Sequence, residues 1–353
     1  MRTMSQIGRR SPSWRVETMS FMGGIENPPA GRRRRAPSRW AVVWVLLAAS
    51  MAARGSAAPS AVQWTEIRPE LVAEVNRDLK PDVLTADVGI YFPSNLDPGF
   101  AAKLTVEDLV LQFAVAKGAF RKADVQLKLL WIKSGKVDPS YLEIQANDMA
   151  GKTPGSQYVN LYENNLRETS VLSAEARSAF DSIIEKHSGN ARTVYLVVLQ
   201  DVFMSFFEKL DERTWEIRTI TTGGLSFPTY SYKDLPRRIR GVITVNKSEP
   251  LRRIVAHELG HKLMNVSHEY NEMSPQHEIR GDGGLMLYGK GTEIPSGEAG
   301  RWHLERLHRS PFLYRESVAG KRTWNPDYRE GGHYYDPIYG PYVIRFGVAA
   351  PAP

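Results

Sequence analysis

The sequence predicts an α+β fold with a mixed sheet, and three observations lead to this prediction. Helical and strand periodicities alternate between residues 105 and 131. A continuous apolar run from Val194 to Leu199 is typical of a strand that is buried on both faces of a sheet. After Asn265 the periodicity stops until Ser296. We therefore expect an ordered α+β region followed by an irregular lobe.

The composition is that of a globular protein, but its charge is unevenly distributed. The chain of 353 residues carries a formal net charge of +7, and residues 1–58 hold ten of its 46 basic residues and two of its 39 acidic ones. The remainder is close to neutral, which argues against a nucleic-acid partner. The chain has no cysteine, so disulfides and cysteine-ligated metal sites are excluded. Any zinc must bind to His, Asp, Glu or Tyr.

Residues 1–60 are predicted to be a disordered leader and secretory signal. Arg32 to Arg35 and Arg39 form a positive region, Ala41 to Ala53 form a short apolar run, and Ser56 to Ala58 are small residues suited to cleavage. The apolar run is shorter than the roughly 20 residues of a membrane span, so a cleaved signal is favoured over a retained anchor. We therefore expect a secreted or periplasmic protein with no stable membrane span.

The first half of the body shows two helices and two strands. Ala86 to Phe92 is a strand candidate, and Thr105 begins an amphipathic helix as its capping residue. Alternating apolar residues from Val125 to Trp131 then indicate a strand. Ala150 to Asn165 is rich in Gly, Pro and Asn and is predicted to be a loop. Ser173 caps a second helix.

The second half of the body adds strands and then the helix that carries the main motif. Thr219 to Tyr232 is assigned to a sheet edge because it contains a proline, which cannot donate a ladder hydrogen bond. Gly241 to Val245 is another short strand. Glu249-Pro250 is predicted to begin the motif helix, since proline and acidic residues favour the first turn. A last helix is expected after Ser296, and 323–353 is expected to be an irregular Tyr- and Pro-rich tail.

The chemistry of the chain is concentrated in the sequence His257-Glu258-Leu259-Gly260-His261. Histidines four residues apart lie on one face of a helix, so both imidazoles can reach a single metal ion. With the glutamate between them they form the HExxH pattern of zinc hydrolases, in which zinc and a carboxylate activate a water molecule. A catalytic zinc needs a third protein ligand from beyond the helix. His268 is the nearest candidate, and its competitors are Ser267, Glu269, His277 and Asp282.

This part of the sequence resembles the metzincin clan of zinc metallopeptidases, whose pattern is HExxHxxGxxH followed by a methionine turn. In that family a left-handed glycine ends the helix and turns the chain so that the third histidine meets the metal. Here Met264 stands at the glycine position, and His268 lies one residue further along than the pattern requires. Asn265 is the residue besides glycine that best tolerates the left-handed conformation. We therefore expect a motif helix that is longer by one residue, with the same turn after it.

The second part of the resemblance lies between Gly283 and Gly289, where Met286 is flanked by glycines. The resemblance implies that this methionine forms a floor beneath the metal and that Tyr288 assists at the oxyanion. It also implies a zincin-like catalytic domain over 61–322, with an active-site helix, a mixed sheet above the cleft and an irregular lower lobe. An edge strand within Leu225 to Tyr232 would pair with an extended peptide substrate.

These observations predict an exported, zinc-dependent metalloendopeptidase that acts on a peptide or protein substrate. The resemblance implies that Zn²⁺ is bound by His257, His261 and His268, and that Glu258 as general base and Tyr288 are catalytic. Two alternatives stay open: an HExxH peptidase of another clan with Asp282 as third ligand, and an exported zinc-binding module without catalysis. A structural helix that binds no metal is a third interpretation.

Overall fold

The structure, a computed structural model, describes residues 62–101, 104–149, 171–186, 191–211, 213–229, 232, 235–247, 252–266, 284–286, 291, 293–294, 297–327, 333–335 and 343–345. All of these residues belong to one unit, Pro59–Pro353. The leader predicted at 1–60 and the loop predicted at Ala150 to Asn165 lie outside the described residues.

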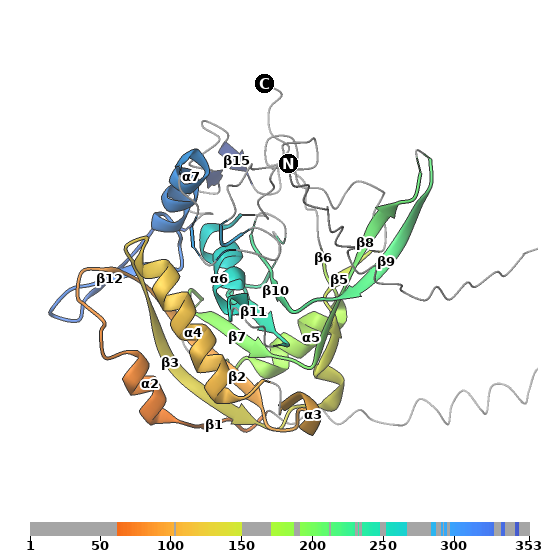
Figure 1. Ribbon diagram of the computed structural model, residues 1–353, viewed down its shortest axis with the longest axis horizontal. Helices are drawn as coiled ribbons and strands as arrows, with labels where there is room; N and C mark the ends of the chain where they lie inside the picture. The colour runs from red at the N-terminus through yellow and green to blue at the C-terminus, as the bar shows by residue number, and fades with distance from the viewer. Residues whose placement is uncertain are drawn as a thin grey trace, which may run out of the picture. The chain divides into compact units, whose positions relative to one another are not determined.

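An eight-stranded mixed sheet forms the centre of the fold (Figure 1). Its main path runs in the order β1 (Thr65–Glu66), β3 (Val125–Gly135), β2 (Leu84–Pro93), β7 (Val194–Val198), β11 (Val242–Val245) and β10 (Gly224–Ser226). Off this path, β12 (Leu313–Glu316) pairs with β2 and with β13 (Arg322–Trp324). Strands β3, β2, β7 and β11 are parallel, whereas β10 is antiparallel to β11. The predicted α+β class with a mixed sheet is therefore confirmed.

Two helices begin where the sequence supplies capping residues. The side chain of Thr105 accepts a hydrogen bond of 3.1 Å from the backbone N–H of Asp108 at the start of α4 (Val106–Arg121). Ser173 accepts one of 2.9 Å from Ala176 at the start of α5 (Ala174–Ile183). The other helical segments are α2 (Pro69–Val75), α3 (Pro98–Ala101), the 3-10 turn η1 (Pro139–Tyr141), α6 (Ile254–Met264) and α7 (Gly297–His308).

The motif helix α6 is buried along its whole length. It packs against α4, α7 and the two strands β10 and β11 at one edge of the main sheet (Figure 1). The prediction that this helix begins at Glu249-Pro250 is wrong, because the helix begins at Ile254. Arg252 has a φ of 49°, and a residue in this left-handed conformation cannot continue a right-handed helix.

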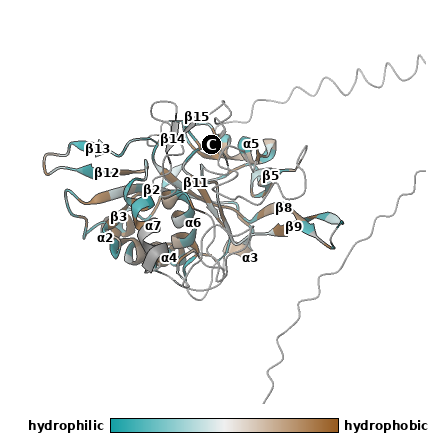
Figure 2. Ribbon diagram, turned by 90° about the horizontal axis from the view of Figure 1, so that it is seen from above, coloured by the Kyte–Doolittle hydropathy of each residue, from teal (hydrophilic) through white to brown (hydrophobic). Residues whose placement is uncertain are grey.

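A separate three-stranded sheet consists of β4 (Glu143–Gln145), β8 (Asp201–Lys209) and β9 (Trp215–Thr221). The β8–β9 ribbon extends away from the main sheet in Figure 1, and Figure 2 shows hydrophobic residues along it. Ile217 and Ile220 of β9 are large hydrophobic residues that are exposed. The edge strand predicted at Thr219 to Tyr232 is thus divided between the end of β9 and β10.

Two small sheets complete the described strands. They are the pair β5 (Asn147–Asp148) with β6 (Val171–Leu172) and the pair β14 (His333–Tyr335) with β15 (Val343–Arg345). The tail expected to be irregular over 323–353 therefore begins inside β13 and contributes β14 and β15. Its strands are three residues long, which is too short for an alternating pattern to be recognised in the sequence.

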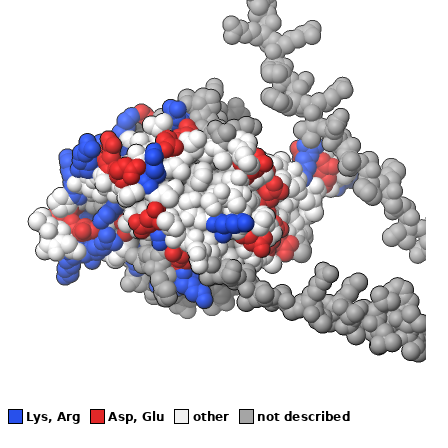
Figure 3. All heavy atoms as spheres, turned by 90° about the horizontal axis from the view of Figure 1, so that it is seen from below, with Lys and Arg blue, Asp and Glu red and all other residues white. Residues whose placement is uncertain are grey.

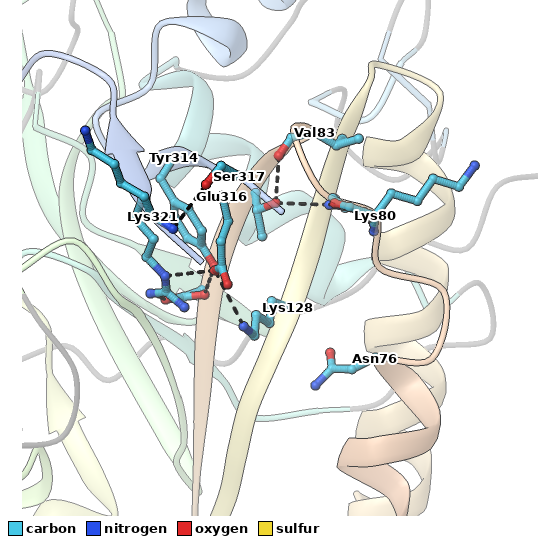
Figure 4. Close-up of polar contacts among 12 residues, drawn as sticks. Asn76, Lys80, Val83, Lys128, Tyr314, Glu316, Ser317 and Lys321 are labelled. Atoms are coloured by element: carbon cyan, nitrogen blue, oxygen red, sulfur yellow. Dashed lines mark hydrogen bonds and ion pairs between the residues drawn. The ribbon is translucent and has the colours of Figure 1, made fainter. Parts of the chain in front are cut away.

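A buried carboxylate anchors the β12–β13 hairpin to the main sheet. Asp87 of β2 accepts hydrogen bonds from the Tyr314 hydroxyl at 2.7 Å and from Arg322 Nη1 at 2.8 Å. Burial, together with the neighbouring Asp87, raises the pKa of Tyr314. At the rim of this cluster Glu316 lies beside Lys128, with 3.9 Å between the charged atoms (Figure 4). The hairpin is therefore held by a network of charge-assisted hydrogen bonds.

The described surface carries charges of both signs. Figure 3 shows acidic and basic side chains interspersed on the face that it presents. None of the helices in the described part of the chain has both the length and the apolar content that crossing a membrane requires.

Candidate metal centre

The two histidines of the motif lie side by side on α6. The centroids of the His257 and His261 rings are 4.7 Å apart, and the ring planes form an angle of 83°. Each residue is only 7% exposed. The spacing of four residues therefore brings the two imidazoles together on one helix face, as the sequence predicts.

Backbone carbonyl groups fix which nitrogen of each histidine is able to bind a metal. His257 Nδ1 lies 2.7 Å from the carbonyl oxygen of Leu285, and His261 Nδ1 lies 2.7 Å from that of Val266. A carbonyl oxygen only accepts, so in both rings Nδ1 must carry the proton and donate. In these tautomers the lone pair is on Nε2, and a carbonyl partner on the other ring nitrogen is the usual arrangement around a metal-binding histidine.

The charge state of the two rings suits the same role. Burial lowers the pKa of His257 to about 4 and that of His261 to about 3, and for His261 the neighbouring His257 adds to the effect. Both imidazoles are therefore neutral at pH 7, which is the form that coordinates a metal. The donor atoms, tautomers and charge of this pair fit a divalent cation such as Zn²⁺.

A left-handed residue ends the motif helix where the sequence predicts it. Asn265 has φ 54° and ψ 48°, directly after the last helical residue Met264. The helix is thus longer by one residue than the metzincin pattern requires, and asparagine supplies the turn. The turn brings the carbonyl of Val266 back to His261, and Arg306 Nη1 of α7 binds the Asn265 carbonyl at 2.9 Å.

The described part of the predicted methionine turn packs directly against the motif helix. Leu285 and Met286 are fully buried. A Cβ atom added to Gly260 would lie 2.5 Å from Met286 Sδ and 3.2 Å from Met264 Cε, so a larger residue in the middle of α6 would force these side chains to move. The Leu285 carbonyl next to it holds His257, and Arg253 binds the carbonyls of Leu285 and Gly291 at 3.3 and 3.2 Å.

Glu258 lies between α6 and the edge strand β10. It is 5% exposed, and the backbone N–H of Ser226 donates a hydrogen bond to its carboxylate. A Cβ added to Gly224 would lie 2.9 Å from Glu258 Cγ, so glycine allows β10 to approach this closely. Burial raises the pKa of Glu258 to about 8, and the cations Arg253 and Lys262 only partly oppose this shift. A carboxyl group with a pKa near neutrality is suited to acid–base catalysis.

Among the described strands, β10 is the last on its side of the main sheet. It runs antiparallel to β11, with Leu225 opposite Thr244. The sequence predicts an edge strand within Leu225 to Tyr232, and the structure forms this strand at Gly224–Ser226, beside Glu258. An edge strand next to a candidate general base gives an extended peptide a backbone to pair with.

Four buried basic residues around α6 were not identified as site residues from the sequence. His303 of α7 is fully buried, and it lies close enough to His261 to contribute to the lowering of that residue's pKa. Lys262 donates to backbone carbonyls, as do Arg253 and Arg306. For Lys262 the sequence offered one signal of a place near the site. It lies four residues after Glu258, and this spacing places both side chains on the same helix face.

The remaining predicted site residues cannot be compared with the structure. These residues, which lie outside the described part of the chain, are Ser267, His268, Glu269, His277, Asp282 and Tyr288. Within the described part, no group of three or more His, Asp or Glu side chains is arranged to hold a metal ion. The described site therefore offers two candidate histidine ligands, and the third ligand stays a prediction.

Comparison with known proteins adds no relative to this description. Neither a protein-family model nor a curated protein matches the sequence. The chemistry of the site therefore depends on the geometry of the two histidines, the glutamate and the edge strand.

Proposed function

We propose that this protein is an exported zinc-dependent metallopeptidase with a zincin-like catalytic domain of the metzincin type. The observation that carries the proposal is the pair of Nδ1-to-carbonyl hydrogen bonds, which leaves the Nε2 lone pairs of His257 and His261 as metal ligands. A helix with only a structural role does not need two buried histidines in matching tautomers. The left-handed turn at Asn265 supports the proposal further, since it is the turn that the metzincin pattern requires.

In this proposal His257 and His261 hold zinc together with His268, which follows the turn. The bound metal would polarise the substrate carbonyl and lower the pKa of the attacking water toward about 7. Glu258 takes a proton from this water and later delivers it to the leaving amine. The N–H of Ser226 fixes the orientation of the carboxylate during both transfers. Tyr288 donates a hydrogen bond to the oxyanion that develops on the substrate.

The substrate is proposed to be a peptide or protein segment in an extended conformation. Of the described strands, β10 ends the sheet on the side of Glu258, so a peptide that pairs with it would pass directly by the carboxylate. The buried, hydrogen-bonded position of Glu258 favours this catalytic function over that of an exported zinc-binding module, because metal binding alone has no use for a general base. Export itself rests on the leader predicted at 1–60.

Zinc analysis and a peptide-library digest of the purified protein test this proposal. We expect about one zinc per chain and cleavage of extended peptides. Glu258→Gln should keep the zinc. Its activity should fall by about 10²- to 10⁴-fold, the usual contribution of a general base. A zinc content near zero in the wild type, or undiminished turnover in the variant, would refute the assignment.

The third ligand is tested by separate variants. His268→Ala is expected to lose most of the bound zinc, while Asp282→Ala keeps it; the opposite result would favour a zinc peptidase of another clan. His308→Ala is the matched control, because His308 is a histidine whose Nε2 bonds to the carbonyl of Ala123, away from the motif. Its zinc content should equal that of the wild type.

A further inference from the structure

Lys262 occupies an unusual position on the motif helix. It follows His261 directly and lies one turn after Glu258, yet it is only 2% exposed. Its Nζ donates hydrogen bonds of 2.5 Å to the carbonyl of Phe227 and 2.9 Å to that of Arg240. A buried amine is costly unless its N–H groups are bonded, so this side chain constrains the two carbonyls that it binds.

The two carbonyls stand at the ends of one connection. Phe227 is the residue directly after β10, and Arg240 lies two residues before β11 begins at Val242. One side chain of α6 therefore holds both the point where the chain leaves the edge strand and the point where it returns to the sheet. Since β10 itself has only three residues, its ladder with β11 is short and gains from this second attachment.

The position of β10 matters for the candidate site. Gly224 approaches Glu258 so closely that an added Cβ would lie 2.9 Å from the glutamate Cγ, and Ser226 donates its N–H to the glutamate carboxylate. A displacement of β10 by a fraction of an ångström would loosen this hydrogen bond. It would also shift the strand edge to which a peptide would bind.

We infer that Lys262 is a positioning residue, which fixes the exit of edge strand β10 and so sets the strand's position relative to Glu258. Its role in substrate binding rests on the proposed function, whereas its role in holding β10 does not. Lys262 acts through the backbone of Phe227 and Arg240 and does not contact the substrate. The hydrogen bonds carry the effect, so a neutral side chain that keeps two N–H donors should retain part of it.

Amide hydrogen exchange of the full-length protein, without added metal, tests the structural part. Lys262→Met and Lys262→Gln have side chains of similar length without charge, and only the glutamine keeps two donors. In Lys262→Met we expect the amides of Gly224 to Phe227 to exchange at least about tenfold faster, with an intermediate effect in Lys262→Gln. The amides of α6 should keep their protection in both variants.

Lys117→Met is the matched control. Lys117 is a second buried lysine on a helix, and its Nζ bonds to the carbonyl of Val75 and, at 2.6 Å, to Asp78, far along the sheet from β10. Its loss should destabilise the protein without speeding exchange in β10. Equal exchange of β10 in Lys262→Met and the wild type, or equal acceleration in the control, would overturn the inference. If Lys262→Met does not fold, Lys262→Gln compared with Lys117→Gln carries the same test.

Peptide kinetics test the part that depends on the proposed function. We compare kcat/KM for a short blocked substrate and for one extended by three residues on either side, the length of β10. Lys262→Met should lower the advantage of the longer substrate by about tenfold, the loss expected for one well-formed hydrogen-bonded contact. An unchanged ratio would contradict the role in substrate binding. If the wild type cleaves no peptide, the proposed function fails, while the exchange experiment still decides whether Lys262 holds β10.

Discussion

The left-handed turn at Asn265 can be tested by two substitutions that differ by a single methyl group. Asn265→Gly and Asn265→Ala both remove the amide side chain, and only alanine keeps a Cβ. Asn265 has φ 54° and ψ 48°, is 1% exposed and directly follows the helix of the two histidines. The comparison between the two variants therefore isolates the backbone conformation from the loss of the side chain.

The sign of the difference follows from the structure. In the left-handed region a residue with a Cβ is disfavoured by about 1–2 kcal/mol, a cost that glycine escapes. Glycine in turn loses about 0.5–1 kcal/mol more conformational entropy on folding than alanine. Asn265→Gly should therefore be more stable than Asn265→Ala by roughly 0.5–1 kcal/mol. At a right-handed helical position the order would be reversed, with glycine less stable by about 1 kcal/mol.

Urea denaturation of the metal-free protein, in the presence of a chelator, measures this difference. Zinc affinity should follow the same order, because the turn carries the Val266 carbonyl that holds His261. A more stable alanine variant would show that Asn265 is not left-handed in solution. The explanation of how this sequence accommodates one extra helical residue would then be refuted.

Three further predictions concern buried groups. Burial raises the pKa of Glu258 from 4.5 to about 8, so between these pH values the metal-free folded protein keeps a proton that the unfolded chain releases. This carboxyl therefore lowers the stability of the wild type as pH rises from 4.5 to 8. The free energy of unfolding of Glu258→Gln, relative to that of the wild type, should rise by up to about 5 kcal/mol between denaturation at pH 4.5 and at pH 8. Gly260→Ala should destabilise the protein by about 1–2 kcal/mol through its clash with Met286, and should stabilise it by about 1 kcal/mol in a Met286→Ala background, as thermal unfolding would report. Asp87→Asn should cost about 2 kcal/mol by weakening its bond from Arg322, with zinc content unchanged.

The parts of the fold that follow from local sequence were predictable. Thr105 and Ser173 cap their helices through hydrogen bonds to residues three positions later, so the signal and the structure lie within one turn. The apolar run at Val194 became β7, in which all five residues are buried. Asn265 belongs to this group as well, since its tolerance of a positive φ is a property of the residue itself.

Other elements carry no such local signal. Helix α2 has only seven residues, and its apolar residues Val72 and Val75 are only partly buried against the core, so its helical periodicity is too short to reveal it. Strand β9 is largely exposed, and it forms because β8 supplies a partner for its backbone. The true start of α6 depends on the left-handed Arg252, a residue type that does not favour this conformation. These features arise from tertiary contacts, which a pattern of residue types does not record.

The candidate site shows the same division. The spacing of His257 and His261 could be read from the sequence, but the groups that orient them could not, because both are backbone carbonyls and every residue has one. The approach of His303 to His261 also depends on how α7 packs against α6. The sequence thus predicts the residues of the candidate site, whereas the groups that hold them follow only from the structure.

Three buried basic side chains fix the described backbone around α6. All three donate to backbone carbonyls around α6. Arg253 donates at the methionine turn, Lys262 at the two ends of the β10–β11 connection, and Arg306 at the left-handed turn. A buried basic side chain strongly disfavours any conformation in which its N–H groups lack partners, so each of these residues selects the backbone conformation that brings carbonyls to it. Apolar side chains would bury the same loops without specifying their backbone. The described backbone that lies beside the two histidines is therefore specified by donors on or next to α6 and α7, which hydrophobic periodicity does not reveal.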